Sequence, residues 1–452
     1  MSRIVVGVDV GSSRVKAAGY LPSGRRAMLS AVPTPVLRRR NGTDFPVLDV
    51  LDAIGTVVTG LGVPTDDIAG IGFASMGEAG TVLRDGELVG LDFPSWHDLR
   101  GAEVVADLNR QFDPSWLTGR TAGHVRTASS LAKLGWLHRA GVPLDGTFLT
   151  VVAAATWRLT GRCVQSSSLA VTGGAFDPVR GEHDEDIWSA AGLASVRQPQ
   201  VEPDVAVPAT GQSAGGWLSL RAGTPVVIAG HDHPVGAVGL GAGERDVIDS
   251  MGSGEALLTR WRPAVVPSIT EVAEMIGTGF SLEAWPGSLD LAVIKEGLRP
   301  GFAMQAMAEH IGIGRDELDE LTGSELGGEP LPADLVARLE TGGDEPAEER
   351  RYPGGAGLDL SSWSALIRYY ALAGADGEDQ LRALTGADGR LVLTGGGLRS
   401  KRWVAAKRAA RNSAAPVVEA PEQEAVTRGA AALAGVAAGW WAEAAGMPGG
   451  LA

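Results

Sequence analysis

The sequence predicts an α/β protein built from two similar halves. Its first segment follows the pattern strand, tight turn, strand, tight turn, strand, which is typical of an antiparallel meander. The first turn, Gly11-Ser12-Ser13, follows the apolar run Ile4–Val10. A second glycine-serine turn, Gly252-Ser253-Gly254, lies between strand-like runs about half a chain later. Two hairpins of one kind, one in each half, indicate an internal duplication.

Strand-like and helix-like stretches alternate through the rest of the chain. We expect domains over 1–242 and 243–452, with the acidic, Gly- and Pro-rich stretch 312–355 as connector. Helices are predicted over 50–61, 102–112, 128–140, 233–241, 400–411 and 424–441, and strands over 68–74, 224–229, 246–251, 255–261, 390–394 and 416–418.

Composition limits the classes of protein to consider. The 452 residues exceed the usual size of one hydrophobic core, and the apolar and charged fractions are those of a globular protein. The net charge of −15 argues against nucleic acid or an anionic membrane as partner. Cys163 is the single cysteine, so no intrachain disulfide or multi-cysteine metal site can form.

The ends of the chain suggest a cytoplasmic protein. The first residues lead directly into a strand-like run and do not resemble a signal peptide. The most apolar tract, 429–442, is shorter than the roughly 20 residues of a membrane-spanning helix. We interpret that tract as a buried, alanine-rich helix.

The first hairpin has the residues of a phosphate site. A turn of Gly11, Ser12 and Ser13 exposes backbone N–H groups and hydroxyls, and Lys16 can add a positive charge. Asp9, at the end of the strand, could hold Mg²⁺, which prefers carboxylates and retained waters. An ordinary hairpin with a solvated aspartate is the alternative.

The second half offers two further glycine turns. Gly252 and Ser253 could grip a polyphosphate as the first turn does. Gly396 and Gly397, at a strand end before a helix that opens at Ser400, suit close approach of a nucleoside to the backbone. Three such turns at strand ends favour a nucleotide site.

Asp232 follows a buried strand in Gly230-His231-Asp232-His233. It could simply cap the following helix. It could also be the general base that accepts a hydroxyl proton during phosphoryl transfer, a reaction that needs one positioned carboxylate.

Taken in order, these motifs resemble the FGGY carbohydrate kinases of the actin-like ATPase superfamily, over nearly the whole chain. Asp9-x-Gly11-Ser12-Ser13-x-x-Lys16 is similar to the first phosphate loop of the family. The other matching segments are the sugar loop Ile71 to Glu78, Trp96-x-Asp98-x-Arg100, Lys133 to Leu137, Gly230 to Gly239 with Asp232, the second phosphate loop Ser250 to Ser253, and the adenosine loop Gly395 to Ser400.

The resemblance implies two duplicated actin-like, ribonuclease H-like domains with a nucleotide cleft between them. It implies ATP and Mg²⁺ as cofactors and a small sugar or polyol, such as xylulose or ribulose, as acceptor. It assigns Asp232 as general base, Asp9 to the metal, and Met76, Gly77, Glu78, Trp96 and Asp232 to the acceptor. Asp98 and Arg100 are interpreted as structural ion-pair members, and a homodimer is the assembly considered.

Several positions depart from the family pattern. The second phosphate loop is usually Gly-Thr-Ser, whereas this chain has Gly252-Ser253-Gly254. Met76 replaces a common glutamine of the sugar loop, and Glu78 agrees with glycerol kinases. The second family signature, at 355–368, keeps little more than Gly-x-Gly-Leu. These changes leave the acceptor open.

Two other functions remain as alternatives, and a third is disfavoured. A nucleotide-driven switch of the same superfamily would not need the loops of Glu78 and Trp96. A dehydratase activator needs an iron–sulfur cluster, which one cysteine per chain does not support. A degenerate member would bind a sugar without phosphoryl transfer.

Overall fold

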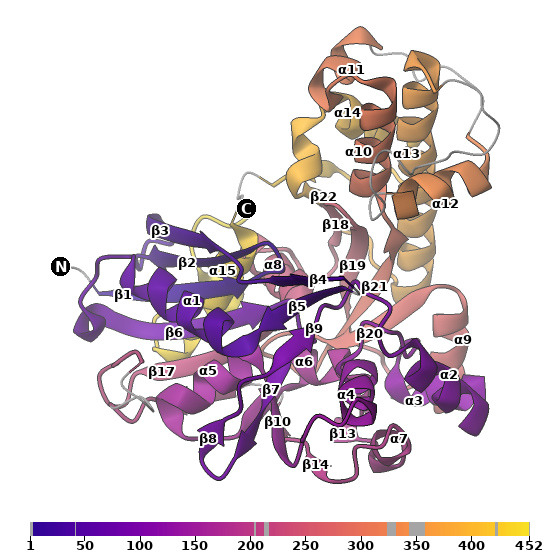
Figure 1. The fold of residues 1–452 in the computed structure, drawn as a ribbon. Helices are drawn as coiled ribbons and strands as arrows, with labels where there is room; N and C mark the ends of the chain where they lie inside the picture. The colour runs from indigo at the N-terminus through magenta and orange to yellow at the C-terminus, as the bar shows by residue number, and fades with distance from the viewer. Residues whose placement is uncertain are drawn as a thin grey trace. The chain divides into compact units, whose positions relative to one another are not determined.

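The computed structural model describes residues 3–40, 42–202, 205–211, 217–322, 331–342, 358–420 and 424–451. The chain forms two compact units (Figure 1). Unit 1 comprises Met1–Ala242, Arg262–Ala292 and Glu424–Ala452, and unit 2 comprises Gly243–Trp261 and Val293–Gln423. The expected break after residue 242 coincides with one boundary between the units, while two later segments pack with unit 1.

The main sheet of unit 1 has the strand order β16-β17-β6-β1-β2-β3. The predicted meander is confirmed, because β1, β2 and β3 pair antiparallel. On the other side of β1, the strands β6 and β17 run parallel to it. The six strands are β1 (Ile4–Val10), β2 (Arg14–Tyr20), β3 (Arg26–Pro33), β6 (Ile68–Ser75), β16 (Val205–Pro208) and β17 (Pro225–His231).

Helices cover both faces of this sheet, which explains why its parallel strands are apolar throughout. Val6 and Val8 share a core with α1 and α5, while Val5 packs toward α15 on the opposite face. The helices of unit 1 are α1 (Val47–Thr59), α2 (Ala102–Gln111), α3 (Pro114–Thr121), α4 (Ser130–Arg139), α5 (Val151–Thr160), α6 (Ser167–Thr172), α7 (Glu185–Ala190), α8 (Asp232–Leu240), α9 (Ile269–Gly277) and α15 (Ala425–Ala437).

Short strands complete unit 1. They form the sheets β4-β5-β9 and β14-β10-β7-β8 and the pairs β11-β15 and β12-β13. Their bounds are β4 (Leu37–Arg39), β5 (Gly42–Pro46), β7 (Gly80–Arg84), β8 (Glu87–Leu88), β9 (Asp92–Pro94), β10 (Gly146–Thr150), β11 (Val164–Ser166), β12 (Phe176–Asp177), β13 (Glu182–His183), β14 (Val196–Arg197) and β15 (Gln200–Glu202), with β20 (Phe280–Ala284) later in the chain.

Unit 2 contains a group of helices and five strands that follow the order β21-β19-β18-β22-β23 in their sheet. The second hairpin is confirmed, since β18 and β19 pair antiparallel. Its elements are β18 (Val247–Met251), β19 (Glu255–Trp261), β21 (Leu291–Leu298), β22 (Leu391–Thr394), β23 (Val417–Glu419), α10 (Pro300–Ile311), α11 (Arg315–Leu321), α12 (Ala333–Gly342), α13 (Leu360–Thr385) and α14 (Lys401–Ala410).

The expectation of a connector over 312–355 is wrong in part. Helices α11 and α12 lie in this stretch, each with a buried apolar side chain, Leu318 and Leu339. Its residues 323–330 and 343–355 are outside the described residues. The same holds for the start of the eroded signature, whose described part, 358–368, leads into α13.

Helix α15 packs closely on α8 and on β1 and β6, as the yellow helix in Figure 1 shows. Glycines make this contact possible. A Cβ added at Gly239 of α8 would lie 1.8 Å from the carbonyl oxygen of Ala425, and one at Gly429 would lie 1.9 Å from that of Val235. Because the clashing atoms belong to the backbone, the overlap could not be relieved by rotating a side chain, and the helices would have to move apart.

We therefore expect Gly239→Ala to destabilise the protein by about 1–3 kcal/mol, the usual cost of overpacking. The midpoint of urea-induced unfolding measures the effect. Gly277→Ala is the control, because a Cβ at Gly277 in α9 would have no neighbour within 4 Å. Equal midpoints for the two variants would contradict the interpretation of the contact.

Candidate active site

The parallel strands of unit 1 bring three acidic residues to one edge of the sheet. In the pairing of β1, β6 and β17, Asp9 lies opposite Ala74, and Ser75 lies opposite His231. Glu78 follows three residues after Ser75, and Asp232 follows His231 directly. Since the carboxyl ends of parallel strands share an edge, the structure groups Asp9, Glu78 and Asp232, all within unit 1.

Asp9 lies in an environment that disfavours its negative charge. Burial, and after it the negative charge of Asp232, raises the pKa of Asp9 to about 7, and Glu424 adds to the rise. The charge of Lys16 opposes the shift. A buried carboxylate next to another negative charge is stabilised when a cation binds to it.

Lys16 forms an ion pair with Glu424, whose Oε2 lies 2.9 Å from the Lys16 Nζ. Glu424 precedes α15, so this partner comes from the far end of the chain. The hairpin turn itself is held by Thr34, whose hydroxyl donates to the Gly11 carbonyl at 2.7 Å. The exposed Ser13 and half-buried Ser12 remain at the tip of this turn.

The backbone before Asp232 is fixed in a glycine-specific shape. Gly230 has a φ of +130°, and an added Cβ would lie 2.9 Å from Ser168 Oγ. The same Oγ accepts the N–H of His231 at 3.0 Å. Asp232 is then the first residue of α8. Its Oδ1 is buried and has no hydrogen-bond partner, although the side chain as a whole is 28% exposed.

Glu78 presents a second carboxylate with a buried oxygen. Its carbonyl accepts from the hydroxyl of Ser130 at 2.7 Å, and its Oε2 has no hydrogen-bond partner. Burial raises the pKa of Glu78 to about 8 against the opposing charges of His231 and Arg126. Of its predicted companions, Gly77 has a φ of +104°, while the side chain of Met76 is buried in the core.

His231 and Glu283 were not predicted as site residues. The Nδ1 of His231 lies 2.9 Å from Oε2 and 3.1 Å from Oε1 of Glu283, on β20. Although burial alone would lower the pKa of His231, the charges of Glu283, Asp232 and Glu78 outweigh burial and raise it to about 10. No sequence signal pointed to Glu283, because it lies 52 residues further along the chain.

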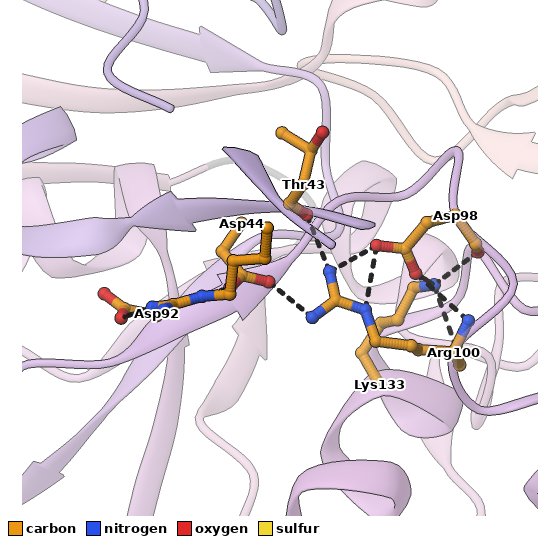
Figure 2. Close-up of polar contacts among 7 residues, drawn as sticks. Thr43, Asp44, Asp92, Asp98, Arg100 and Lys133 are labelled. Carbon is orange, nitrogen blue, oxygen red and sulfur yellow. Dashed lines mark hydrogen bonds and ion pairs between the residues drawn. The ribbon is translucent and has the colours of Figure 1, made fainter. Parts of the chain in front are cut away.

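The loop that carries Trp96 is held by a network of charges (Figure 2). Lys133 Nζ donates to the carbonyls of Asp98 at 2.7 Å and Arg100 at 3.0 Å. Arg100 donates through Nε to Asp98 at 3.0 Å, and its Nη1 lies 2.6 Å from Asp44. The expectation that Asp98 and Arg100 are ion-paired is confirmed. Trp96 itself is 38% exposed and contacts His97 edge to face.

The predicted nucleotide residues of unit 2 lie together. A Cβ at Gly395 would lie 2.7 Å from the carbonyl oxygen of Met251, and one at Gly397 would lie 2.6 Å from the Met251 Cβ. The glycine turn at 395–397 therefore packs directly beside the strand end that leads to Gly252 and Ser253. Ser400 caps α14 and donates to Asp319 Oδ2 at 2.5 Å.

A buried ion cluster supports the same region of unit 2. Lys407 Nζ lies 2.5 Å from Asp249 and 2.6 Å from Glu255, which lie on the two strands of the second hairpin on either side of its turn. Burial, followed by the charge of Asp249, raises the pKa of Glu255 to about 7. For Lys407, burial alone would lower the pKa, but the two carboxylates outweigh it and raise the pKa above its usual value. The cluster ties the hairpin to α14.

The residues of unit 1 fit a magnesium ion. Within the described ranges no group of three or more His, Cys, Asp or Glu side chains forms a metal cage. Mg²⁺, however, usually binds through one or two carboxylates and keeps several waters. The carboxylate of Asp9, whose pKa is raised by burial and by the charge of Asp232, matches this requirement.

We expect Glu78→Gln to stabilise the protein in a pH-dependent way. Below pH 4 the carboxyl is protonated in both the folded and the unfolded state, so the substitution should change little. Above the unfolded pKa of 4.5 the folded state resists ionisation, and the gain should grow up to about pH 8. Urea unfolding between pH 4 and 9, in EDTA, measures this. A gain that does not vary with pH would contradict the assigned burial.

Lys407→Met should destabilise unit 2 by about 3–5 kcal/mol, because removing one partner leaves two buried carboxylates uncompensated. Lys401→Met, on the same helix, is the matched control: Lys401 is 81% exposed, and its ion pair with Glu419 spans 3.6 Å. Thermal unfolding of both variants should separate them clearly, and similar midpoints would refute the buried cluster.

The chain has clear relatives. A profile of the FGGY family of carbohydrate kinases, N-terminal domain, matches residues 4–239, more than half of the sequence. Autoinducer-2 kinase of Salmonella typhimurium is 29% identical over 191 residues, which are 40% of this chain and 35% of that protein. The corresponding enzyme of Photorhabdus laumondii is 30% identical over 193 residues, with the same coverage. The match thus spans about a third of the length of these relatives.

Solved structures share the fold over most of the chain. Xylulose kinase from Lactobacillus acidophilus superposes with a TM-score of 0.79 at 17% identity, covering 98% of this chain and 91% of that one. Glycerol kinase from Plasmodium falciparum gives 0.78 at 15% identity, covering 97% and 90%. The expected fold class is confirmed as the mixed α/β, two-domain, actin-like fold of these sugar kinases.

Among the helices of the described residues, none combines the length and the apolarity needed to cross a bilayer.

The match of the family profile to residues 4–239 contains Asp9, Glu78 and Asp232, all three acids of the sheet edge. The chain belongs to the FGGY family of carbohydrate kinases.

Proposed function

We propose that the chain is an ATP-dependent kinase that transfers the γ-phosphoryl group to a hydroxyl of a small sugar or polyol. The observation that carries this proposal is the grouping of Asp232 with Asp9 and Glu78 at one sheet edge. Phosphoryl transfer needs little covalent chemistry from the protein, but it needs a placed base and compensation of phosphate charge. Membership of the FGGY family supports the same reaction.

Asp232 is the proposed general base. Its carboxylate accepts the proton of the attacking hydroxyl, and its position as first residue of α8, after the fixed backbone of Gly230, limits where it can point. Asp9 is the proposed holder of Mg²⁺, which supplies charge compensation for the phosphates when bound. Gly11, Ser12, Ser13 and Lys16 are proposed to contact phosphate.

The adenosine and the remaining phosphate contacts are assigned to unit 2. The backbone at the half-buried Gly252 and the exposed Ser253 is proposed to approach phosphate oxygens, with the turn held by the Gly252 N–H, which donates to the Gly254 carbonyl at 3.0 Å. Gly396 and Gly397 lack side chains where a ribose or base would approach. Ser400 is already engaged as a helix cap, so its role is to shape the turn as much as to contact ligand.

The acceptor is proposed to be a neutral polyhydroxy compound. Glu78 brings an unpartnered carboxyl oxygen that can accept from a hydroxyl, and Trp96 offers an apolar ring for the C–H face of a carbon chain. The nearby carboxyl groups of Asp9 and Glu78, which both feel the charge of Asp232, disfavour a carboxylate-bearing substrate. Xylulose, ribulose, glycerol and tetritols should therefore be better acceptors than gluconate in a coupled ADP assay.

Asp232→Asn should lower kcat by about 10²–10⁴ while ATP binding is kept, because the amide cannot accept the proton. ADP formation with the best acceptor and calorimetric titration with ATP measure the two properties. Asp113→Asn is the control, since Asp113 caps α3 through its side chain and asparagine caps equally well. Retained turnover in Asp232→Asn would refute the assignment. ADP formation that no acceptor stimulates would favour the nucleotide switch.

A further inference from the structure

Asp232 is flanked by a histidine that is itself held from behind. His231 Nε2 lies 3.4 Å from Asp232 Oδ1, and His231 Nδ1 lies 2.9 Å from Glu283 Oε2. A carboxylate therefore faces each ring nitrogen. Because a carboxylate only accepts hydrogen bonds, both nitrogens must carry a proton for the arrangement to be stable.

The ring has little freedom to leave this position. The backbone N–H of His231 donates to the Ser168 Oγ, which fixes the main chain that carries the ring. The Glu283 side chain, which holds the ring Nδ1, is only 7% exposed. His233, the other histidine beside Asp232, lacks these restraints. Its Nε2 lies 4.0 Å from Asp232 Oδ1, and its side chain is 41% exposed. The two histidines thus form a natural comparison within one motif.

The contact selects one oxygen of Asp232. Oδ1 is the buried oxygen; it has no hydrogen bond, and the His231 Nε2 approaches it to 3.4 Å, within ion-pair distance. The side chain is nevertheless 28% exposed, so its open surface lies away from Oδ1. An N–H that fixes Oδ1 would leave Oδ2 directed toward the ligand side.

We propose that Glu283 and His231 are positioning residues for Asp232: Glu283 orients the His231 ring, and the ring N–H holds Oδ1 so that Oδ2 receives the acceptor hydroxyl's proton. The inference rests on the proposed function of Asp232. It adds a residue from the segment after β19 to the chemistry of the first half of the chain. Small errors in the placement of a base can cost about 10²-fold in rate.

The test compares kcat and KM of His231→Gln, Glu283→Gln and the double variant. We expect His231→Gln to lower kcat by about 10–10²-fold and Glu283→Gln by about 3–10-fold, with KM for ATP unchanged. Because Glu283 acts through His231, adding Glu283→Gln to His231→Gln should cost less than twofold. The matched control His233→Gln should stay within about threefold of the wild type.

A second background separates positioning from plain structural support. Without the carboxylate of Asp232 there is no base to orient, so Glu283→Gln should not change the residual rate of Asp232→Asn. Fully additive losses, or an equal loss in the Asp232→Asn background, would overturn the proposal. If Glu283→Gln unfolds, Glu283→Asp, which keeps the charge, serves in the same cycle, and thermal unfolding identifies folded variants.

Failure of the proposed function would be visible separately. In that case the wild type would phosphorylate no acceptor, whatever the state of Glu283. The contact between His231 and Glu283 can then be tested by ¹⁵N NMR of the His231 ring. Both ring nitrogens should carry protons at pH 7, and Glu283→Gln should shift the Nδ1 signal. A neutral ring in the wild type would overturn the positioning pair.

Discussion

The contact of α15 with the sheet and with α8 is the constraint on which unit 1 depends. An added Cβ would lie 1.8 Å from the Thr427 carbonyl at Gly7 and 2.1 Å from the Ala430 carbonyl at Gly72. Helix α15 can therefore pack this closely only at positions where the strands and α8 have glycine and no side chain intervenes. This placement brings Glu424, just before the helix, to Lys16, and it supports α8, whose first residue is Asp232.

That scaffold concentrates negative charge where the sheet ends. Asp9 and Glu78 both lie in surroundings that raise their pKa, and each feels the charge of Asp232. Such an edge costs folding stability, because the unfolded chain would hold the same carboxylates fully hydrated. Carboxyl groups whose negative charge is disfavoured are well suited to bind a cation and to accept protons. The cost in folding stability therefore fits a site that is selected for function.

The sequence predicted what depends on local pattern and strand direction. Asp9 and Asp232 each follow a buried apolar run, and parallel strands bring such ends together. The position of Glu283 could not be predicted, since it depends on a segment that returns to unit 1 after β19. The ion pair of Lys16 with Glu424 was missed for the same reason. Helices α11 and α12 were missed because glycine and proline obscured their apolar positions.

The two hairpins show how a repeated pattern can take on different roles. Each joins an antiparallel pair and has a parallel strand beside it, and each carries an aspartate before its glycine turn. In unit 2, Asp249 is neutralised inside the protein by Lys407, which also holds Glu255. In unit 1, Lys16 lies opposite Asp9 in the strand pairing but forms its ion pair with Glu424, and burial and the charge of Asp232 raise the pKa of Asp9. The second hairpin therefore has an internal ion cluster that supports its turn, while the first has a carboxylate whose raised pKa suits the metal-binding role proposed for it.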